Sequence, residues 1–351
     1  PLISLMKDQV DQLNIAGIPA TFINSTLEDS ESYQRMRQVE NGEIKLLFVA
    51  PERFSLDYFN AFLQKLPIDL VAIDEAHCIS QWGHDFRPSY VDFASHLQYL
   101  PTNPTVLALT ATATPKVADD IQKLLSISPS HTIKTGFIRE NLRFDVVQGM
   151  DQRTFIKNYL TNPESEAAGI IYASTRKEVE EICEWLNHNH FKAVRYHAGL
   201  SEQERQMNQE LFLFDEVPIM VATNAFGMGI NKPNVRFVIH YALPATIESY
   251  YQEAGRAGRD GLESDAILLF SPNDLRIRNF LIEQSEGDEA HKEHEYEKLR
   301  QMQAYTSAET CLQRYILQYF GDEGEDCKKC SNCLDERELL DITIDAQKVL
   351  T

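Results

Sequence analysis

The chain has 351 residues, of which 43% are hydrophobic, and its formal net charge is −20 at pH 7. This length and hydrophobic content predict a globular protein with room for two domains and an appendage. No apolar run approaches the roughly 18 residues of a membrane span, so we expect no membrane partner and a cytoplasmic (in a bacterium, nucleoid) or nuclear location. The acidic balance counts against nucleic-acid binding, although backbone amides, hydroxyls and stacked aromatics can still grip single strands.

Apolar runs alternate with helix-like periodicity along the chain. Apolar residues within the range 2–13 form one face of a first predicted helix. Buried parallel strands are predicted at 46–50, 70–73 and 106–109. After a turn-rich segment at 136–149, strand-like runs resume at 169–173, 219–222 and 235–239. The pattern predicts two α/β lobes in series.

Two acidic residues, Asp74 and Glu75, follow the predicted strand at 70–73, and His77 comes two positions later. A carboxylate at the rigid tip of a strand can hold Mg²⁺ directly or through water, and Glu75 could orient an attacking water. The alternative is that Asp74 caps the next helix. We favour the metal site because an arginine motif occurs farther along the same chain.

That motif, QEAGRAGR at 252–259, brackets two arginines with glycines. Fork-shaped, always-charged guanidinium groups suit a γ-phosphate, and Gly255 and Gly258 let the backbone approach a ligand. A solvated helix face would also carry Arg256 and Arg259, but it does not explain glycines that weaken a helix. Carboxylates on one lobe and arginines on the other predict a nucleotide site between the lobes, where phosphoryl transfer could drive closure.

Six motifs resemble, in order and spacing, the core of a superfamily 2 helicase. They are PLISLMKDQ at 1–9, APER at 50–53, DEAH at 74–77, TATAT at 110–114, ATNAFGMGI at 222–230 and the arginine motif. The segment CISQWGHDFRPSY at 78–90 narrows the resemblance to the RecQ family of DNA helicases. It implies two RecA-like parallel-sheet lobes, a small helical zinc-binding subdomain and the start of a winged-helix domain. The corresponding ranges are 1–145, 146–275, 276–337 and 338–351.

The resemblance implies that ATP and Mg²⁺ drive 3′-to-5′ unwinding of DNA in recombination and repair. The residues expected to be catalytic are Asp74, Glu75, His77, Gln252, Arg256 and Arg259, and those expected to bind the nucleotide are Asp74, Gly229, Arg256 and Arg259. The loop 78–90 would couple DNA contact to hydrolysis. Its aromatic residues Trp82, Phe86 and Tyr90 offer stacking surfaces, while His84 and Arg87 can engage the DNA backbone. Ordinary core packing is the alternative for these aromatics.

Further contacts with single-stranded and partly duplex DNA are predicted on both lobes. They are Ser4, Lys7, Arg53, Ser174, Thr175, His197, Thr223 and Asn224. The last five follow strands of the second lobe, and ligands bind at the carboxyl ends of strands in open α/β sheets. Helix capping is the alternative for each serine and threonine.

Four cysteines form a separate signal near the end of the chain. Cys327, Cys330 and Cys333 are separated by two residues each, and Cys311 precedes them by sixteen positions. Four thiolates predict a tetrahedral Zn²⁺ with no open position, which is a structural site. A disulfide is the alternative, but it is rare in cytosolic proteins.

No Gly-Lys dipeptide occurs in the chain, so the phosphate-binding loop that the resemblance requires is missing. We expect an internal fragment of a helicase that is inactive by itself. A catalytically silent DNA-binding or scaffolding protein is the alternative, and the retained Glu75, Arg256 and Arg259 count against it. A metal-dependent nuclease would need more carboxylates than Asp74 and Glu75 provide.

Overall fold

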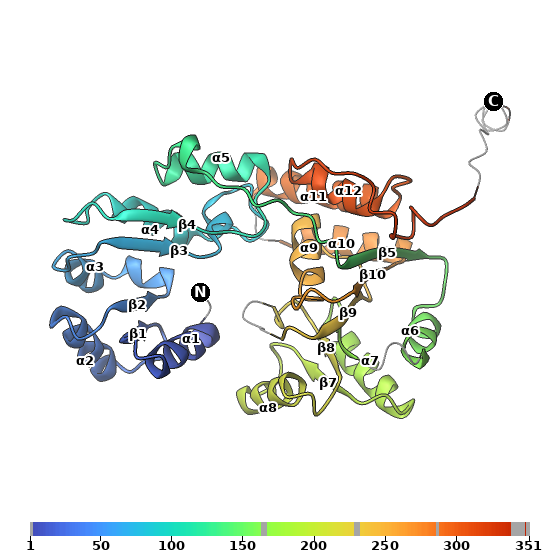
Figure 1. Cartoon of the computed structure of the whole chain (residues 1–351), viewed down its shortest axis with the longest axis horizontal. Helices are drawn as coiled ribbons and strands as arrows, with labels where there is room; N and C mark the ends of the chain where they lie inside the picture. The colour runs from blue at the N-terminus through green and yellow to red at the C-terminus, as the bar shows by residue number, and fades with distance from the viewer. Residues whose placement is uncertain (1–2, 163–166, 228–231, 286–287, 338–347, 349–351) are drawn as a thin grey trace.

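The structure is a computed structural model that describes residues 3–162, 167–227, 232–285, 288–337 and 348. Figure 1 shows two α/β lobes beside each other, with helices of the last third of the chain packed above the second lobe and near α5 (Pro115–Leu124) of the first. The predicted fold class, two parallel-sheet lobes followed by a helical part, is confirmed. Among the described residues, no helix has the length and apolar character needed to cross a membrane.

The first lobe alternates short strands with helices. Its elements are α1 (Ile3–Ile15), β1 (Ala20–Ile23), α2 (Asp29–Glu40), β2 (Leu46–Val49), η1 (Pro51–Ser55), α3 (Asp57–Leu63), β3 (Leu70–Ile73), η2 (Ala76–Ile79), α4 (Pro88–Leu97), β4 (Thr105–Ala108), α5 and η3 (Pro129–His131). The three predicted strands are present within one residue. Strand β1 pairs in parallel with β2, and β3 pairs in parallel with β4, as separate two-stranded sheets within the described residues.

The prediction that the first-lobe strands are buried on both faces is wrong. Leu46, Leu70 and Leu107 are exposed, whereas Ile73 is buried. Side chains project from the two faces of a sheet, and in β3 and β4 the exposed Leu70 and Leu107 alternate with less exposed residues, so one face of this sheet is not covered. The lobe's hydrophobic core lies where helices cover the inner face, around Ile23, Phe59, Ile73 and Ile121.

The second lobe is built on a six-stranded parallel sheet of order β5-β10-β9-β6-β8-β7. Its elements are β5 (Leu142–Gln148), α6 (Gln152–Thr161), β6 (Ala168–Tyr172), α7 (Arg176–His188), β7 (Ala193–Tyr196), α8 (Glu202–Leu213), β8 (Ile219–Ala222), β9 (Val235–His240), α9 (Ile247–Ala254) and β10 (Ser264–Phe270). Every residue of β6 and β8 is buried, as expected for central parallel strands. The predicted boundary between residues 145 and 146 falls inside β5, which pairs with β10 along its whole length.

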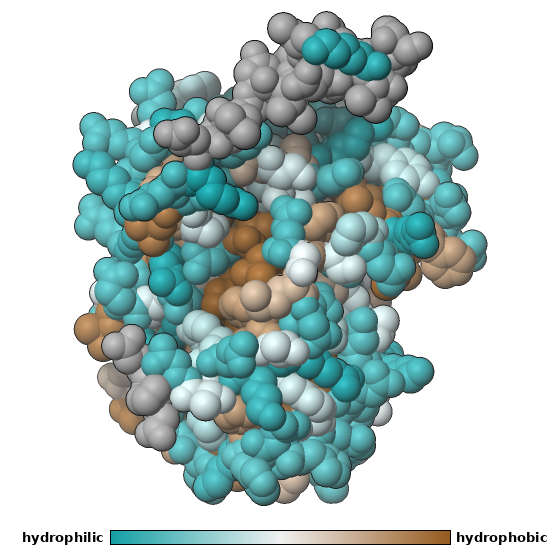
Figure 2. Space-filling model, turned by 90° about the vertical axis from the view of Figure 1, so that its right-hand side faces the viewer, coloured by the Kyte–Doolittle hydropathy of each residue, from teal (hydrophilic) through white to brown (hydrophobic). Residues whose placement is uncertain are grey.

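The helical part comprises α10 (Pro272–Glu283), α11 (Glu289–Thr306) and α12 (Leu312–Tyr319). Leu299, Met302, Ile316 and Phe320 belong to the same buried cluster as one face of the second-lobe sheet. The second lobe and these helices therefore share one hydrophobic core. Viewed from the side of β5 and α6, the surface is mainly hydrophilic with apolar side chains gathered near its centre (Figure 2). Most of the predicted range 338–351 lies outside the described residues.

Candidate active site and metal centre

The acidic side of the candidate active site begins where β3 ends. Asp74 is exposed, and Glu75 adopts a left-handed backbone conformation with φ 50°, which turns the chain sharply into η2. Such a backbone conformation is unfavourable for residues other than glycine and often marks a functional position. Asp74 accepts a bond from the Glu75 backbone N–H at 3.0 Å, and no side chain caps η2. The capping alternative for Asp74 is therefore wrong.

His77 holds the acidic turn against the loop that follows β4. Its Nδ1 lies 3.2 Å from Glu75 Oε2 and 3.0 Å from Thr110 Oγ1, and its ring stacks on His84 at 4.4 Å. Burial, then the nearby His84, lowers the pKa of His77 to about 3. Burial, followed by the charge of Asp74, raises the pKa of Glu75, while Arg256 opposes this shift. His77 is thus a neutral positioning group beside the carboxylate.

The basic side lies on the second lobe at the end of α9. Arg256 is buried and interacts electrostatically with Glu75 of the first lobe. Burial, then the positive charges of Arg256 and Arg139, lowers the pKa of Arg259. Three arginines therefore lie close to one another. This concentration of positive charge suits an anion such as a phosphate.

A cleft of about 390 Å³ lies between the two lobes. Residues from both lobes line it, including His77, His84, Arg87, Asn224 and Arg256. Asp74, Glu75 and Arg259 are not among its lining residues. Gln252 spans the gap, because its Nε2 donates to Thr112 Oγ1 at 2.9 Å. The carboxylates and arginines predicted to share one site thus lie on opposing lobes that contact each other.

The loop 78–90 lies directly beside this cleft. Trp82 is partly exposed, and Lys116 Nζ lies 2.9 Å from the centroid of its ring. The ring of His294, a residue of α11, lies 5.1 Å from the Trp82 ring. His84 and Arg87 line the cleft, and Arg87 pairs with Asp85 at 2.7 Å. At Gly83 a Cβ would lie 2.4 Å from the His77 carbonyl oxygen, so the tight turn requires glycine.

The aromatic residues of the loop do not all reach the surface. Phe86 is half-buried, and Tyr90 is buried in the first-lobe core with its hydroxyl donating to the Asp74 carbonyl at 3.2 Å. The prediction that Tyr90 stacks on bases is therefore wrong, and the core-packing alternative holds for it. Burial also raises the pKa of Tyr90, in keeping with a structural phenol.

Several other predicted DNA contacts have structural partners. The side chain of Thr175 caps α7 by accepting from the Glu178 N–H, as the alternative for this residue anticipated. His197 is buried, its Nε2 lies 2.8 Å from Glu180, and its Nδ1 accepts from Gly199 N–H. Both ring nitrogens of His197 therefore already have partners within the protein. Thr223 is also buried.

The remaining predicted contacts are distributed over both lobes. Lys7 is exposed on α1, and Arg53 donates to the Asn24 carbonyl and to Tyr58 Oη. Ser174 and Asn224 line the cleft, and Ser174 accepts from Arg278 at 3.5 Å. The side chain of Ser4, and Gly229 as a whole, lie outside the described residues.

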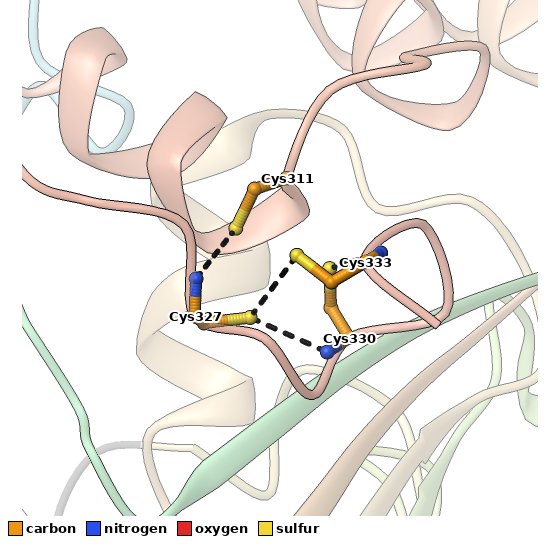
Figure 3. A group of neighbouring side chains, drawn as sticks. All are labelled: Cys311, Cys327, Cys330 and Cys333. Atoms are coloured by element: carbon orange, nitrogen blue, oxygen red, sulfur yellow. Dashed lines mark hydrogen bonds between the residues drawn. The ribbon is translucent and has the colours of Figure 1, made fainter. Parts of the chain in front are cut away.

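The four cysteines converge on one point, as Figure 3 shows. The sulfurs of Cys311, Cys327, Cys330 and Cys333 all lie within 4.8 Å of one another, and none forms a disulfide. Tetrahedral Zn–S bonds of roughly 2.3 Å place sulfurs about 3.8 Å apart, so the cluster fits the ion. Backbone N–H groups of Arg314 and of Cys327 point at Cys311 Sγ, an arrangement that favours thiolates. The residues therefore fit a structural Zn²⁺ rather than the alternative disulfide.

Sequence patterns did not single out several residues of the site. Thr112 lies within the quoted TATAT motif, and its position in that motif was a usable signal. Arg278, which lines the cleft from α10, and Arg139, which contacts the arginine turn, belong to no recognised motif.

Comparisons with known proteins agree with this geometry. The DEAD/DEAH box helicase model matches residues 1–121, the helicase conserved C-terminal domain matches 151–261, and the RecQ zinc-binding model matches 272–334. The chain is 54% identical to the ATP-dependent DNA helicase RecQ of Bacillus subtilis over all of its own length and 59% of that protein. It is 41% identical to the RecQ helicase of Pasteurella multocida, again over all of its own length and 55% of that protein.

Solved structures share the fold at low identity. Dbp5 of S. cerevisiae, bound to RNA and ADP BeF3, matches with a TM-score of 0.61 and 17% identity over 100% of this chain and 78% of its own. Mss116p, bound to single-stranded RNA and AMP-PNP, matches with a TM-score of 0.57 and 17% identity over 90% of this chain and 71% of its own. The chain spans somewhat more than half the length of the curated RecQ relatives above. With helicase models on both lobes, a zinc-binding model on the cysteine cluster and this identity, the chain belongs to the RecQ family.

Proposed function

We propose that the complete protein is an ATP-dependent DNA helicase that moves 3′ to 5′, and that this chain carries most of its motor. The observation that supports the proposal most strongly is the opposition of Glu75 on the first lobe and Arg256 on the second, within electrostatic range of each other. The hydrogen bond between Gln252 and Thr112 joins the same two lobes. Such a split site makes hydrolysis depend on how the lobes meet.

Each residue of the pair has a role that fits phosphoryl transfer. Asp74, exposed at the strand tip, would hold Mg²⁺, and Mg-ATP would supply the transferable phosphoryl group. Glu75 would orient the attacking water and accept its proton, and its raised pKa makes it a better base than an exposed glutamate. Arg256 and Arg259 would stabilise negative charge that develops on the transferring group.

The proposed substrate is single-stranded and partly duplex DNA. Trp82, Phe86, His84 and Arg87 form a loop that runs beside the cleft, so DNA contact there can change the geometry around His77. We keep Lys7, Arg53, Ser174 and Asn224 as further contacts, and Gly229 as a nucleotide contact. We propose that it acts in recombination and repair, in the cytoplasm at the bacterial nucleoid or in the nucleus.

A catalytically silent DNA-binding or scaffolding role is the second candidate. It is favoured by one observation, the absence of any Gly-Lys dipeptide and hence of a phosphate-binding loop of the usual kind in these 351 residues. The two candidates differ in whether the complete protein hydrolyses ATP. We propose that this chain alone does not.

The test is Glu75→Gln in the complete protein. We expect nucleotide binding to persist while DNA-stimulated ATP turnover falls by roughly 100-fold or more, because the amide cannot take the proton from water. Glu43→Gln, at an exposed first-lobe glutamate whose carboxylate accepts from Asn41 Nδ2, is the matched control and should keep full turnover. Unchanged turnover in Glu75→Gln would reject the assignment, and no turnover in the unsubstituted complete protein would favour the silent role.

A further inference from the structure

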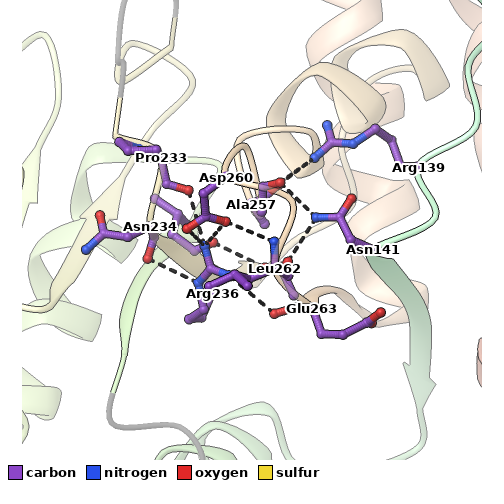
Figure 4. A network of polar contacts seen from close by, with 12 residues as sticks. Arg139, Asn141, Pro233, Asn234, Arg236, Ala257, Asp260, Leu262 and Glu263 are labelled. Atoms are coloured by element: carbon purple, nitrogen blue, oxygen red, sulfur yellow. Dashed lines mark hydrogen bonds and ion pairs between the residues drawn. The ribbon is translucent and has the colours of Figure 1, made fainter.

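The segment that joins the two lobes crosses directly over the turn that carries the arginines. Arg139 in this segment donates from Nη1 to the Gly255 carbonyl at 3.1 Å, and from Nη2 to the carbonyls of Ala257 at 2.8 Å and Gly258 at 3.2 Å. Figure 4 shows Arg139 and Asn141 reaching toward this turn from the connecting segment. A guanidinium suits the position because its fork can bind several carbonyls at once, and a positive charge is favourable at the end of helix α9.

A second side chain of the same segment closes the turn. Asn141 Nδ2 donates to the Gly258 carbonyl at 2.8 Å and to the Leu262 carbonyl at 2.9 Å. Gly258 has φ +62°, and a Cβ there would lie 2.4 Å from Asn141 Nδ2, so only glycine fits against this amide. The backbone on both sides of Arg256, and the residue before Arg259, is thus fixed by side chains that come from more than a hundred residues away.

The joining segment is itself held from its other side by the helical part. Phe137 N–H donates to Asp322 at 2.9 Å, its carbonyl accepts from Tyr251 Oη at 2.7 Å, and its ring stacks on Phe320 at 4.5 Å. Lys329, which lies between two cysteines of the cluster, donates to the Glu140 carbonyl. The backbone around Arg139 is therefore held in place by contacts on both sides, and a residue that positions others must itself be fixed.

We propose that Arg139 is a positioning residue that fixes the backbone from which Arg256 and Arg259 reach the transferring phosphoryl group. The inference rests on the proposed ATP hydrolysis and adds to it the residue that sets the arginine geometry. Arg139 bonds to carbonyl oxygens of the turn and not to any residue lining the cleft. Its removal should therefore misplace the arginines without removing them, and a misplacement of about 1 Å can cost roughly 100-fold in rate.

The experiment is steady-state ATP hydrolysis by the complete protein at saturating DNA, with Arg139→Ala as the variant. We expect kcat to fall roughly 10- to 100-fold while KM for ATP changes by less than about 3-fold, because ground-state binding is kept and transition-state contacts are lost. Affinity for Mg-ADP should persist, and affinity for ADP with aluminium fluoride should fall as kcat does. Arg143→Ala is the matched control, because Arg143 pairs with Asp145 and Asp265 and is not bonded to the turn.

If circular dichroism shows that the alanine variant does not fold, kcat is measured for Arg139→Lys instead. A lysine keeps the charge but lacks the fork, so kcat should fall by an intermediate factor. A double-mutant cycle of Arg139→Ala and Arg256→Ala then distinguishes failure of the proposed site from failure of the positioning role. If Arg256→Ala leaves kcat unchanged, the proposed site is wrong. If Arg256→Ala lowers kcat but Arg139→Ala does not, or if Arg139→Ala costs the same factor with and without Arg256, the positioning role is overturned.

Discussion

His77 makes the first lobe sensitive to acid in a way that can be calculated. The buried ring has a pKa of about 3 in the folded protein, against roughly 6.5 for an unfolded histidine. Because the folded value is lower, the unfolded state binds the proton first. The full contribution of the neutral ring to stability is present above about pH 6.5 and is lost as the pH falls toward 3. At pH 5 the loss is about 2 kcal/mol, from about 1.4 kcal/mol for each unit below the unfolded pKa.

The assay is urea unfolding of the first lobe at pH 7.5 and pH 5.0. The chain has two tryptophans, Trp82 in the first lobe and Trp185 in the second. Trp185→Phe therefore leaves Trp82 as the only tryptophan, a first-lobe reporter whose ring also contacts His294 of α11. We expect the free energy of unfolding to drop by about 2 kcal/mol between the two conditions: the lowered pKa of His84 adds to this drop, and the raised pKa of Glu75 offsets part of it.

His77→Asn in the same background isolates the contribution of His77. The variant should be less stable at pH 7.5, because it loses the stacked ring and the bond to Thr110, yet its acid-dependent drop should shrink by about 2 kcal/mol. His131→Asn, at an exposed first-lobe histidine, should keep the full drop. If His77→Asn shows the same drop as the parent, then His77 is not the buried neutral group that the structure describes.

Two further predictions concern the loop and the cysteine cluster. Trp82→Ala should reduce DNA stimulation of ATP hydrolysis more than the basal rate, since stacking is worth ~1–3 kcal/mol per base; equal losses in both rates would make Trp82 a packing residue, and Trp185→Phe is the control. Cys330→Ser should abolish zinc binding, measured by elemental analysis, and raise hydrogen exchange over residues 322–335, because metal binding contributes about 10–16 kcal/mol of folding free energy in small modules. Cys183→Ala should keep the zinc, and a reduced, chelator-free parent without zinc would contradict the assignment.

Six strands were predictable because a parallel strand is a short apolar run, and the predicted limits agree with β2, β3, β4, β6, β8 and β9 within about one residue. Strands β1 and β10 were not predicted, and β5 lies inside the segment 136–149 that was wrongly expected to be turn-rich. What could not be predicted was how the strands of the first lobe pair. Burial of Leu70 or Leu107 depends on neighbours far away in the chain, and these two side chains are exposed. Local sequence predicts where a strand lies, but it does not predict how many other strands pair with it.

The same limit applies to the site. Asp74, Glu75 and the arginines could be proposed as site residues because their residue types and spacing are unusual. Thr175 and His197 also follow strands, but in the structure Thr175 caps a helix and His197 is a buried partner of Glu180. No sequence pattern indicated a role for Arg139. It acts through backbone carbonyls that lie 116 to 119 residues away, and a carbonyl has no residue type that a pattern could recognise.

The distribution of the cores suggests which parts move together. One buried cluster unites the second-lobe sheet with α11, α12 and Cys330, whereas the first lobe has its own. Contacts across the boundary include the bond from Gln252 to Thr112 and the edge contact between Trp82 and His294, which are small and partly exposed. Interfaces of this kind permit relative motion. The arginine turn, Arg139 and the zinc loop would therefore move as one body relative to Glu75, and the ATP hydrolysis that we propose would depend on how the two lobes meet.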